Sequence, residues 1–368
     1  MMNFVLNTSN YMEEYHKRSN SESAFSADKK MLGWNVSQKR NDRINCALSS
    51  IGVWHNLFQI GRSQNIVPHS LVQLCFNNRS HILNVAVSPV VKWAGGKRQL
   101  LPQLTKLLPQ KFNVYYEPFV GGAALLTYLY NKNLITKAIA SDTNEDLINL
   151  YETIKRDPVL LAYELGKLDL SNFSDIYYSA REEFNRTPLF TPRKAALFIY
   201  LNRFGFNGIW RVNFKGRYNV PFGRHTNPHI PIEKISEFSK MLKRVTLLNK
   251  SFEYATVNAK KGDFVYFDPP YQPISKTSCF TDYTSQGFTI EHQAKLAENF
   301  KILDKKGVKI MLSNSAVTEI KDLYNGFYLK NVPANRTINS DSSKRTGFKE
   351  VVITNYKVSQ SELETMDP

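Results

Sequence analysis

The sequence predicts an α/β fold with a mostly parallel sheet, interrupted by a mainly helical insertion. Short apolar strands alternate with helices of 10–17 residues before residue 160 and again after residue 260. The stretch 160–251 breaks this alternation and carries several prolines. The chain has 368 residues, enough for two domains or for one domain with an extension.

The elements of the predicted sheet region follow one another along the chain. The segments expected to be strands are 114–119, 137–142, 263–268, 308–314 and 350–356. The segments expected to be helices are 121–133, 144–157, 290–306 and 319–326. The strands are short and apolar, and the helices place apolar residues at helical spacing. The last strand follows a loop rather than a helix, so we expect it to run antiparallel to the others.

Residues 1–87 differ from the rest of the chain. They contain twelve Asn and eleven Ser, and residues 2–45 show little periodicity, which predicts an extension of unknown role that is partly disordered. Translation upstream of the true start is the alternative. The expected division is an extension at 1–87, a sheet domain at 88–159 and 252–358, an insertion at 160–251 and a tail at 359–368.

The composition argues against several classes of protein. No run of 18 apolar residues exists, and the first 30 residues lack the apolar core of a signal peptide. Three widely spaced cysteines suit neither a disulfide scaffold nor a zinc cage and fit a reducing cytosol. The motif H-E-x-x-H is absent, and Pro228 separates His225 from His229, so we expect no metal.

The charge points to a polyanionic partner. The formal net charge is +16, which favours nucleic acid, although a basic surface on an unrelated enzyme is an alternative. Residues 184–232 contain no Asp or Glu, whereas they carry eight Lys or Arg and ten aromatic residues. Such a mixture suits a surface that neutralises phosphates and stacks on bases. We expect about half of these aromatic residues to belong to the core instead.

The strongest motif is D-P-P-Y at 268–271, directly after a predicted strand. By chance, such a tetrapeptide occurs in roughly one chain of this length in a hundred. The exocyclic amine of a nucleobase is a poor nucleophile because its lone pair is delocalised into the ring. The Asp268 carboxylate and the Pro269 carbonyl can accept its two N–H bonds and so localise the lone pair. Pro270 stiffens the turn, and Tyr271 offers a face to a flipped base; a rigid turn with a buried tyrosine is the alternative.

Two glycine motifs precede this tetrapeptide. In Y-Y-E-P-F-V-G-G (115–122), Gly121 permits close approach of a ligand to a helix N-terminus. Asp142 ends the next strand, where such folds place an acid against ribose hydroxyls. NAD, ATP or S-adenosylmethionine could bind such a motif, but the missing phosphate-binding fingerprints disfavour the first two. The segment K-W-A-G-G-K (92–97) adds an aromatic face and two cations, or is a basic loop leading into a helix.

Together these motifs resemble the Dam-type, GATC-modifying DNA N6-adenine methyltransferases of the D12 class. The resemblance covers about 90–357 in the family's order and includes the segment R-F-G-F-N-G-I-W-R-V-N (203–213). It implies a Rossmann-like, class I S-adenosylmethionine-dependent methyltransferase fold in which the insertion recognises the target DNA. The implied enzyme methylates N6 of a flipped adenine in double-stranded DNA, within GATC. We expect a monomer in the cytoplasm of a bacterium or a phage-infected cell.

The resemblance also implies roles for individual residues. Those implied to be catalytic are Asp268, Pro269, Pro270 and Tyr271. Those implied to bind S-adenosylmethionine are Trp93, Lys97, Phe119, Gly121, Asp142 and Asp268. Those implied to contact DNA are Lys92, Phe206, Asn207, Ile209, Arg211 and Pro221. Arg211 would read a guanine, and Phe206 would fill the gap left by the flipped adenine. Several members have Tyr where this chain has Phe206, so a hydroxyl is lost here.

Two other functions remain open. One is a catalytically silent DNA-binding protein on the same scaffold, which the intact motifs oppose. The other is methylation of single-stranded DNA or RNA, because several amine methylations share D-P-P-Y. The basic, Ser-rich stretch 335–348 suits a loop on the DNA backbone or a solvated loop equally well. The exact recognition sequence and any partner restriction nuclease are also open.

Overall fold

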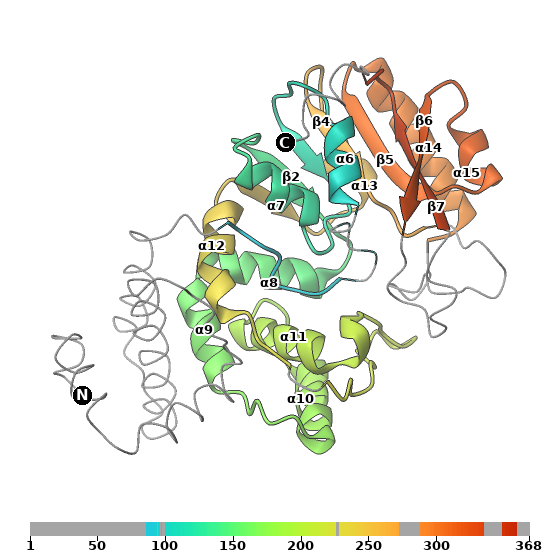
Figure 1. Cartoon of the computed structure of the whole chain (residues 1–368). Helices are drawn as coiled ribbons and strands as arrows, with labels where there is room; N and C mark the ends of the chain where they lie inside the picture. The colour runs from blue at the N-terminus through green and yellow to red at the C-terminus, as the bar shows by residue number, and fades with distance from the viewer. Residues whose placement is uncertain are drawn as a thin grey trace, which may run out of the picture.

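A computed structural model describes residues 86–358, except 94, 96, 98, 99, 226, 227, 272–287 and 335–347. The expectations for the N-terminal extension, for most of the stretch 335–348 and for the C-terminal tail therefore lie outside the described residues. Seven strands form one sheet in the order β3-β2-β1-β4-β5-β7-β6 (Figure 1). Neighbours among β1 to β5 are parallel, and β7 is antiparallel to β5 and β6. The mostly parallel sheet and the antiparallel last strand confirm the expectations from the sequence.

The strands are β1 (Tyr115–Glu117), β2 (Ala138–Ser141), β3 (Val245–Leu248), β4 (Phe264–Phe267), β5 (Lys309–Ser315), β6 (Tyr328–Ala334) and β7 (Phe348–Thr354). The helices that accompany the sheet are α6 (Leu101–Leu104), η2 (Thr105–Leu107), α7 (Ala124–Asn131), α8 (Glu145–Arg156), α13 (Phe252–Thr256), α14 (Ile290–Lys305) and α15 (Thr318–Leu323). The helices of the insertion are α9 (Pro158–Gly166), α10 (Ser174–Arg186), α11 (Pro192–Phe204), η3 (Phe206–Gly208) and α12 (Ile232–Leu242). No helix in these described ranges is both long and apolar enough to cross a membrane.

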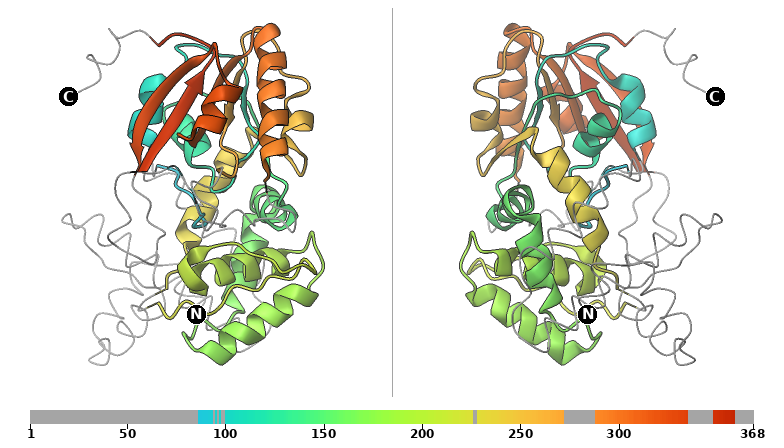
Figure 2. Two further views of the ribbon diagram at one scale, coloured as in Figure 1. Left: turned by 90° about the vertical axis from the view of Figure 1, so that its right-hand side faces the viewer. Right: turned by 90° about the vertical axis from the view of Figure 1, so that its left-hand side faces the viewer.

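The central strand β4 shows why the sheet is buried on both faces. All four of its residues are buried, as expected for a parallel strand covered by helices on each side. Phe264 and Tyr266 join the apolar cluster that contains α7, whereas Val265 and Phe267 join the cluster that contains α14. Figure 2 shows the teal helices α6 and α7 on one side of the sheet and the orange α14 on the other.

Two strands differ from the expectation. Strand β3 lies inside the stretch assigned to the insertion, yet it pairs with β2 as an edge of the sheet. The expected boundary at residue 251 is therefore wrong, and the sheet resumes at Val245. The sequence pattern also does not predict β6, the other edge strand. It carries Lys330, Asn331 and Pro333, which are typical of edges rather than of central strands.

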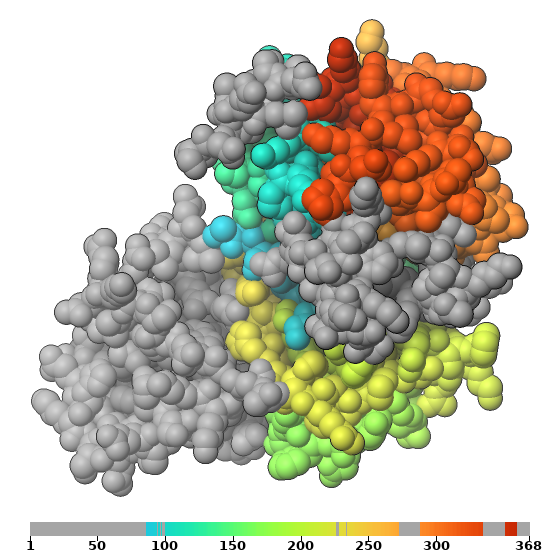
Figure 3. All heavy atoms as spheres, turned by 45° about the vertical axis from the view of Figure 1, so that its right-hand side comes forward, coloured from blue at the N-terminus to red at the C-terminus, as the bar shows by residue number. Residues whose placement is uncertain are grey.

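The insertion shares its core with the sheet. One continuous cluster of buried side chains runs from Ala138 on β2 through Leu150 on α8 to Leu197 on α11. In Figure 1, α8 lies between the sheet and α11. The segment before α6, through Val90 and Val91, joins the same cluster. Figure 3 shows atoms of this blue segment between the yellow insertion and the teal atoms of the sheet region. This packing fixes the insertion relative to the sheet edge.

Candidate active site

Three strand ends bring the motifs together. Strands β2, β1 and β4 are neighbours, and their carboxyl ends lead into Asp142, the Gly121 turn and Asp268, respectively. Parallel α/β sheets bind ligands at this edge. Strand β7 runs the other way and begins at the same edge, where Glu350 lies opposite Ser315 of β5. The first residues of β7 therefore lie beside the carboxyl ends of the parallel strands.

Lys97 joins the K-W-A-G-G-K segment to the D-P-P-Y turn. Its ammonium group lies 2.8 Å from Oδ1 of Asp268, donates to the Gly95 carbonyl at 2.9 Å, and lies 4.3 Å from the centre of the Tyr271 ring. Burial raises the pKa of Asp268 to about 6; Lys97 opposes this rise and the charge of Glu350 adds to it. At neutral pH Asp268 is therefore mostly ionised beside a cation.

The D-P-P-Y turn is held at two further points. The side-chain amide of Gln293 on α14 donates to the Pro270 carbonyl at 3.0 Å, and Asn314 on β5 donates to Gln293 Oε1 at 2.9 Å. The Tyr271 hydroxyl donates to the Glu350 carboxylate at 2.6 Å. Gln293, Asn314 and Glu350 are buried polar residues that the sequence analysis missed. Their signal is weak, because each stands beside other polar residues of its helix or strand and nothing in the sequence distinguishes it from them.

The Gly121 turn packs directly against Trp93. Gly121 has φ +42°, and a Cβ atom there would lie 2.7 Å from Cδ1 of the Trp93 ring, so only glycine permits this contact. The Trp93 ring also stacks on Phe198, with centroids 6.4 Å apart. Asp142 accepts hydrogen bonds from the backbone N–H groups of Gly121 at 3.1 Å and Asn144 at 2.9 Å. The structure thus brings Trp93, Gly121 and Asp142 together. Burial raises the pKa of Asp142 to about 6.

Glu117, the last residue of β1, is a further acid that the sequence analysis did not single out. It is buried and accepts from the Tyr115 hydroxyl at 2.9 Å and from the Leu126 N–H at 3.2 Å. Burial raises its pKa to about 8, so the side chain is mostly protonated at neutral pH. Phe119, just after it, stacks on Phe252 at 5.6 Å. Within the described ranges, no cluster of three or more His, Cys, Asp or Glu side chains could hold a metal ion.

Residues 205–222 form a hairpin that carries most of the predicted DNA contacts. The Phe206 N–H donates to the Pro221 carbonyl at 2.9 Å, and the Asn219 N–H donates to the Arg211 carbonyl at 3.1 Å. Phe206, Asn207, Arg211 and Pro221 are exposed, whereas Ile209 is half-buried. Arg211 donates from Nε to Asn219 Oδ1 at 2.8 Å and from Nη2 to the Asn219 carbonyl at 3.2 Å. The predicted residues of this hairpin therefore lie close together on one element.

Asn202 at the end of α11 joins Lys92 to this hairpin. Its side-chain oxygen accepts from the Lys92 N–H at 2.8 Å, and its amide donates to the carbonyls of Lys92 at 2.7 Å and Gly208 at 2.9 Å. A Cβ atom on Gly208, whose φ is +63°, would lie 2.8 Å from Cβ of Lys92. Burial and the charge of Arg203 lower the pKa of Lys92. Sequence reasoning missed Asn202, because its partner lies 110 residues away.

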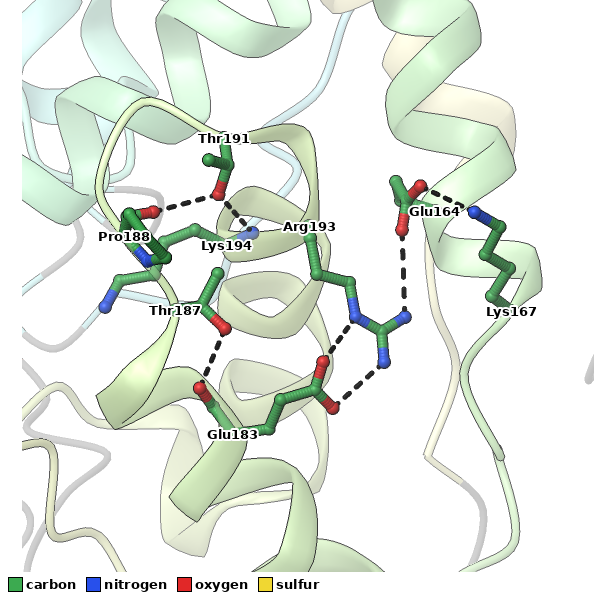
Figure 4. A network of polar contacts seen from close by, with 8 residues as sticks. All are labelled: Glu164, Lys167, Glu183, Thr187, Pro188, Thr191, Arg193 and Lys194. Carbon is green, nitrogen blue, oxygen red and sulfur yellow. Dashed lines mark hydrogen bonds and ion pairs between the residues drawn. The ribbon is translucent and has the colours of Figure 1, made fainter.

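Acids outside the stretch 184–232 neutralise several of its cations. Arg193 on α11 donates to both carboxylate oxygens of Glu183, at 2.6 and 2.9 Å, and its Nη1 lies 3.8 Å from Glu164 (Figure 4). Arg217 donates to Glu182 at 2.7 Å. The unpaired positive charge of this stretch is therefore smaller than its lack of acidic residues suggests.

The aromatic residues of this stretch divide as expected. Six of the ten are buried, namely Phe184, Phe198, Tyr200, Phe204, Trp210 and Tyr218. Phe190, Phe206 and Phe214 are exposed. About half of the aromatic residues therefore belong to the core.

We expect Asn202→Ala to lower the free energy of unfolding by about 2–4 kcal/mol. The change leaves one buried and two partly buried backbone groups without this partner, and each orphaned group costs about 1–3 kcal/mol where water cannot reach it. Urea denaturation measures the loss. Asn258→Ala, at an exposed position after α13, is the matched control and should change stability by under about 0.5 kcal/mol. Equal midpoints for the two variants would show that the Lys92 segment is held by other contacts.

Comparisons with known proteins agree with this arrangement. Residues 93–338 match the family of D12 class N6 adenine-specific DNA methyltransferases. The chain is 41% identical to the type II methyltransferase M1.LlaDCHI of Lactococcus lactis over 74% of this chain and 96% of the relative. It is 43% identical to the type II methyltransferase M.MjaIII of Methanocaldococcus jannaschii, over 73% and 99%. It is 35% identical to the DNA adenine methylase of Escherichia coli K12, over 71% and 93%.

The match covers strands β1 to β6, the hairpin and the D-P-P-Y turn. The chain therefore belongs to the D12 class of N6 adenine-specific DNA methyltransferases.

Proposed function

We propose that this enzyme transfers a methyl group from S-adenosylmethionine to N6 of an adenine that is flipped out of double-stranded DNA, within GATC. The observation that carries the proposal is the contact of Lys97 with Asp268 and Tyr271. It joins the segment of Trp93 to the D-P-P-Y turn at one edge of the sheet. We propose that the enzyme acts in the cytoplasm, where bacterial and phage DNA is found.

The residues at this edge fit the chemical groups of S-adenosylmethionine. Asp142 lies at the end of β2, where it can accept from ribose hydroxyls. Lys97 can pair with the carboxylate of the methionine part, and Asp268 with its ammonium group. Trp93 and Phe119 can supply aromatic faces for the apolar parts of the cofactor, and Gly121 permits its close approach to the backbone. When bound, S-adenosylmethionine supplies an electrophilic methyl group on a sulfonium centre.

The D-P-P-Y turn activates and holds the target base. The Asp268 carboxylate and the Pro269 carbonyl accept the two N6–H bonds, which localises the nitrogen lone pair. Asp268 does so only when ionised, and at neutral pH Lys97 favours that form. Pro270 stiffens the turn, and Gln293 fixes the direction of its carbonyl. The Tyr271 ring stacks on the base, so most of the rate gain comes from positioning and exclusion of water.

The hairpin residues suit a double-stranded substrate. Flipping a base leaves a gap only in a duplex, and the exposed Phe206 ring can fill it. Arg211 can donate two parallel hydrogen bonds to O6 and N7 of a guanine. Asn207, Ile209 and Pro221 are proposed as neighbouring DNA contacts, and Lys92 as a contact beside the flipped base. These features favour duplex DNA over single-stranded DNA or RNA.

Mapping the modified bases tests the proposal. Plasmid from an unmethylated host is incubated with the protein and labelled S-adenosylmethionine, and the modified positions are then sequenced. We expect N6-methyladenine confined to GATC. Label at adenines in other sequences would refute the GATC assignment, and absence of label would refute the activity. Calorimetry with the cofactor then distinguishes a silent DNA-binding protein, which binds no cofactor.

We expect Arg211→Ala to cost about 1–3 kcal/mol of discrimination against sites altered at one guanine. The reason is loss of the forked donor that Asn219 orients. Specificity constants on GATC and on single-base variants measure the effect. Arg186→Ala, which removes another exposed cation at the end of α10, is the control and should weaken binding to all sites equally. An unchanged site preference in Arg211→Ala would remove this residue from base reading.

A further inference from the structure

Glu350 is a buried carboxylate for which the proposed function assigns no role. It is 8% exposed and lies near the start of β7, opposite Ser315 at the end of β5. It accepts a hydrogen bond of 2.6 Å from the Tyr271 hydroxyl, across 79 residues of sequence. A charged acceptor forms shorter and stronger hydrogen bonds than a neutral one. The contact therefore ties the far end of the Tyr271 ring to the sheet.

Glu350 lies near a second acid of the site, Asp268. The site contains a cluster of three acids, Asp268, Glu350 and Glu117. The other groups that interact with Asp268 are Lys97 and the hydroxyls of Tyr115, Tyr266 and Tyr271. The charge of Glu350 raises the pKa of Asp268, which disfavours the ionised form that the reaction needs. Burial of a second carboxylate here is also unfavourable in itself. A carboxylate at this place therefore needs a compensating benefit.

We propose that Glu350 is a positioning residue that holds the Tyr271 ring in the orientation in which it stacks on the flipped adenine. This inference rests on the proposed function. The chain fixes the main chain of the turn through Gln293 and Pro270, but a tyrosine ring can still move about its side-chain bonds. Glu350 removes that freedom by holding the hydroxyl. Small errors in the placement of a reacting group cost large factors in rate.

A double-mutant cycle tests this role. We expect Glu350→Leu to lower the single-turnover methylation rate by roughly 10- to 100-fold, with the Kd for duplex DNA nearly unchanged. Tyr271→Phe keeps the ring but loses the hydroxyl, and should lower the rate similarly. The double variant should be no slower than Tyr271→Phe, because both changes remove one interaction. Glu319→Leu, at an exposed carboxylate on α15, is the control and should keep the wild-type rate.

Two further readouts separate positioning from a merely structural role. Glu350→Gln keeps an acceptor oxygen and should recover most of the rate lost in Glu350→Leu. It also removes a negative charge near Asp268, so the acid limb of its pH–rate profile should move to lower pH. A duplex with 2-aminopurine at the mapped adenine should fluoresce more strongly in Glu350→Leu, because stacking on Tyr271 quenches it in the wild type.

Several results would overturn the inference. They are a wild-type rate in Tyr271→Phe, an undiminished effect of Glu350→Leu in the Tyr271→Phe background, and an unmoved acid limb in Glu350→Gln. If Glu350→Leu does not fold, Tyr271→Phe and Glu350→Gln still decide the question. A wild-type protein that methylates no adenine would instead refute the proposed function, so the two failures are distinguishable.

Discussion

We expect Asp268→Ala to abolish methyl transfer, with a loss on the order of 10³-fold or more, while binding to duplex DNA stays within a few-fold of wild type. The carboxylate is one of two acceptors that localise the lone pair of the adenine amine, and alanine offers no substitute. DNA binding is proposed to depend on the hairpin 205–222 and Lys92, none of which the change removes. Labelled methyl transfer and fluorescence anisotropy measure the two properties separately.

The pH dependence of the methylation rate provides a second test of the role of Asp268. Its pKa is raised to about 6 by burial, and only the ionised form can accept both N–H bonds. As the pH falls through about 6, the carboxylate gains a proton and the wild-type rate should fall with it. Asp268→Asn keeps the size of the side chain but cannot ionise, so its residual rate should lack this limb. Asp175→Ala, an exposed acid on α10, controls for general loss of charge. Wild-type turnover in Asp268→Ala would rule out the mechanism.

The elements predictable from sequence are those whose pattern repeats locally. The continuous apolar run of β4 and the helical spacing of apolar residues in α8 and α14 are buried as expected. Edge strands lack such a pattern, because an edge is only partly buried. Strand β3 has just four residues and follows α12 closely, and β6 carries polar residues and Pro333. Pairing with β2 and β7, rather than local propensity, makes these segments strands.

The residues of the candidate site also fall into those that the sequence predicts and those that it does not. Asp268, Gly121 and Asp142 follow strands, so the rule that parallel sheets bind ligands at the carboxyl ends of their strands is enough to predict that they lie together. Asn202, Gln293 and Glu350 each bind a site residue that lies far away along the chain, by 110, 23 and 79 residues respectively. Nothing in their local sequence indicates those partners. The ion pairs of Arg193 and Arg217 are equally hard to predict from sequence, because their partners Glu183 and Glu182 lie on a different element, helix α10.

We expect Lys97→Met to lower the methylation rate about tenfold or more at pH 7, even at saturating cofactor. Its ammonium group lies 2.8 Å from Asp268 and lowers the pKa of that carboxyl, so its removal raises the pKa above about 6. A larger fraction of Asp268 then carries a proton at pH 7 and cannot accept both N–H bonds.

The acid limb of the pH–rate profile of Lys97→Met should therefore move to higher pH, with much of the rate restored near pH 9. This shift is opposite in sign to that expected for Glu350→Gln, although both side chains belong to one cluster. General damage to the site would lower the rate at every pH and could not move the limb in opposite directions. Lys106→Met, at an exposed position in η2, is the matched control and should leave the limb in place. A limb in Lys97→Met that coincides with wild type would mean that Lys97 does not set the charge of Asp268.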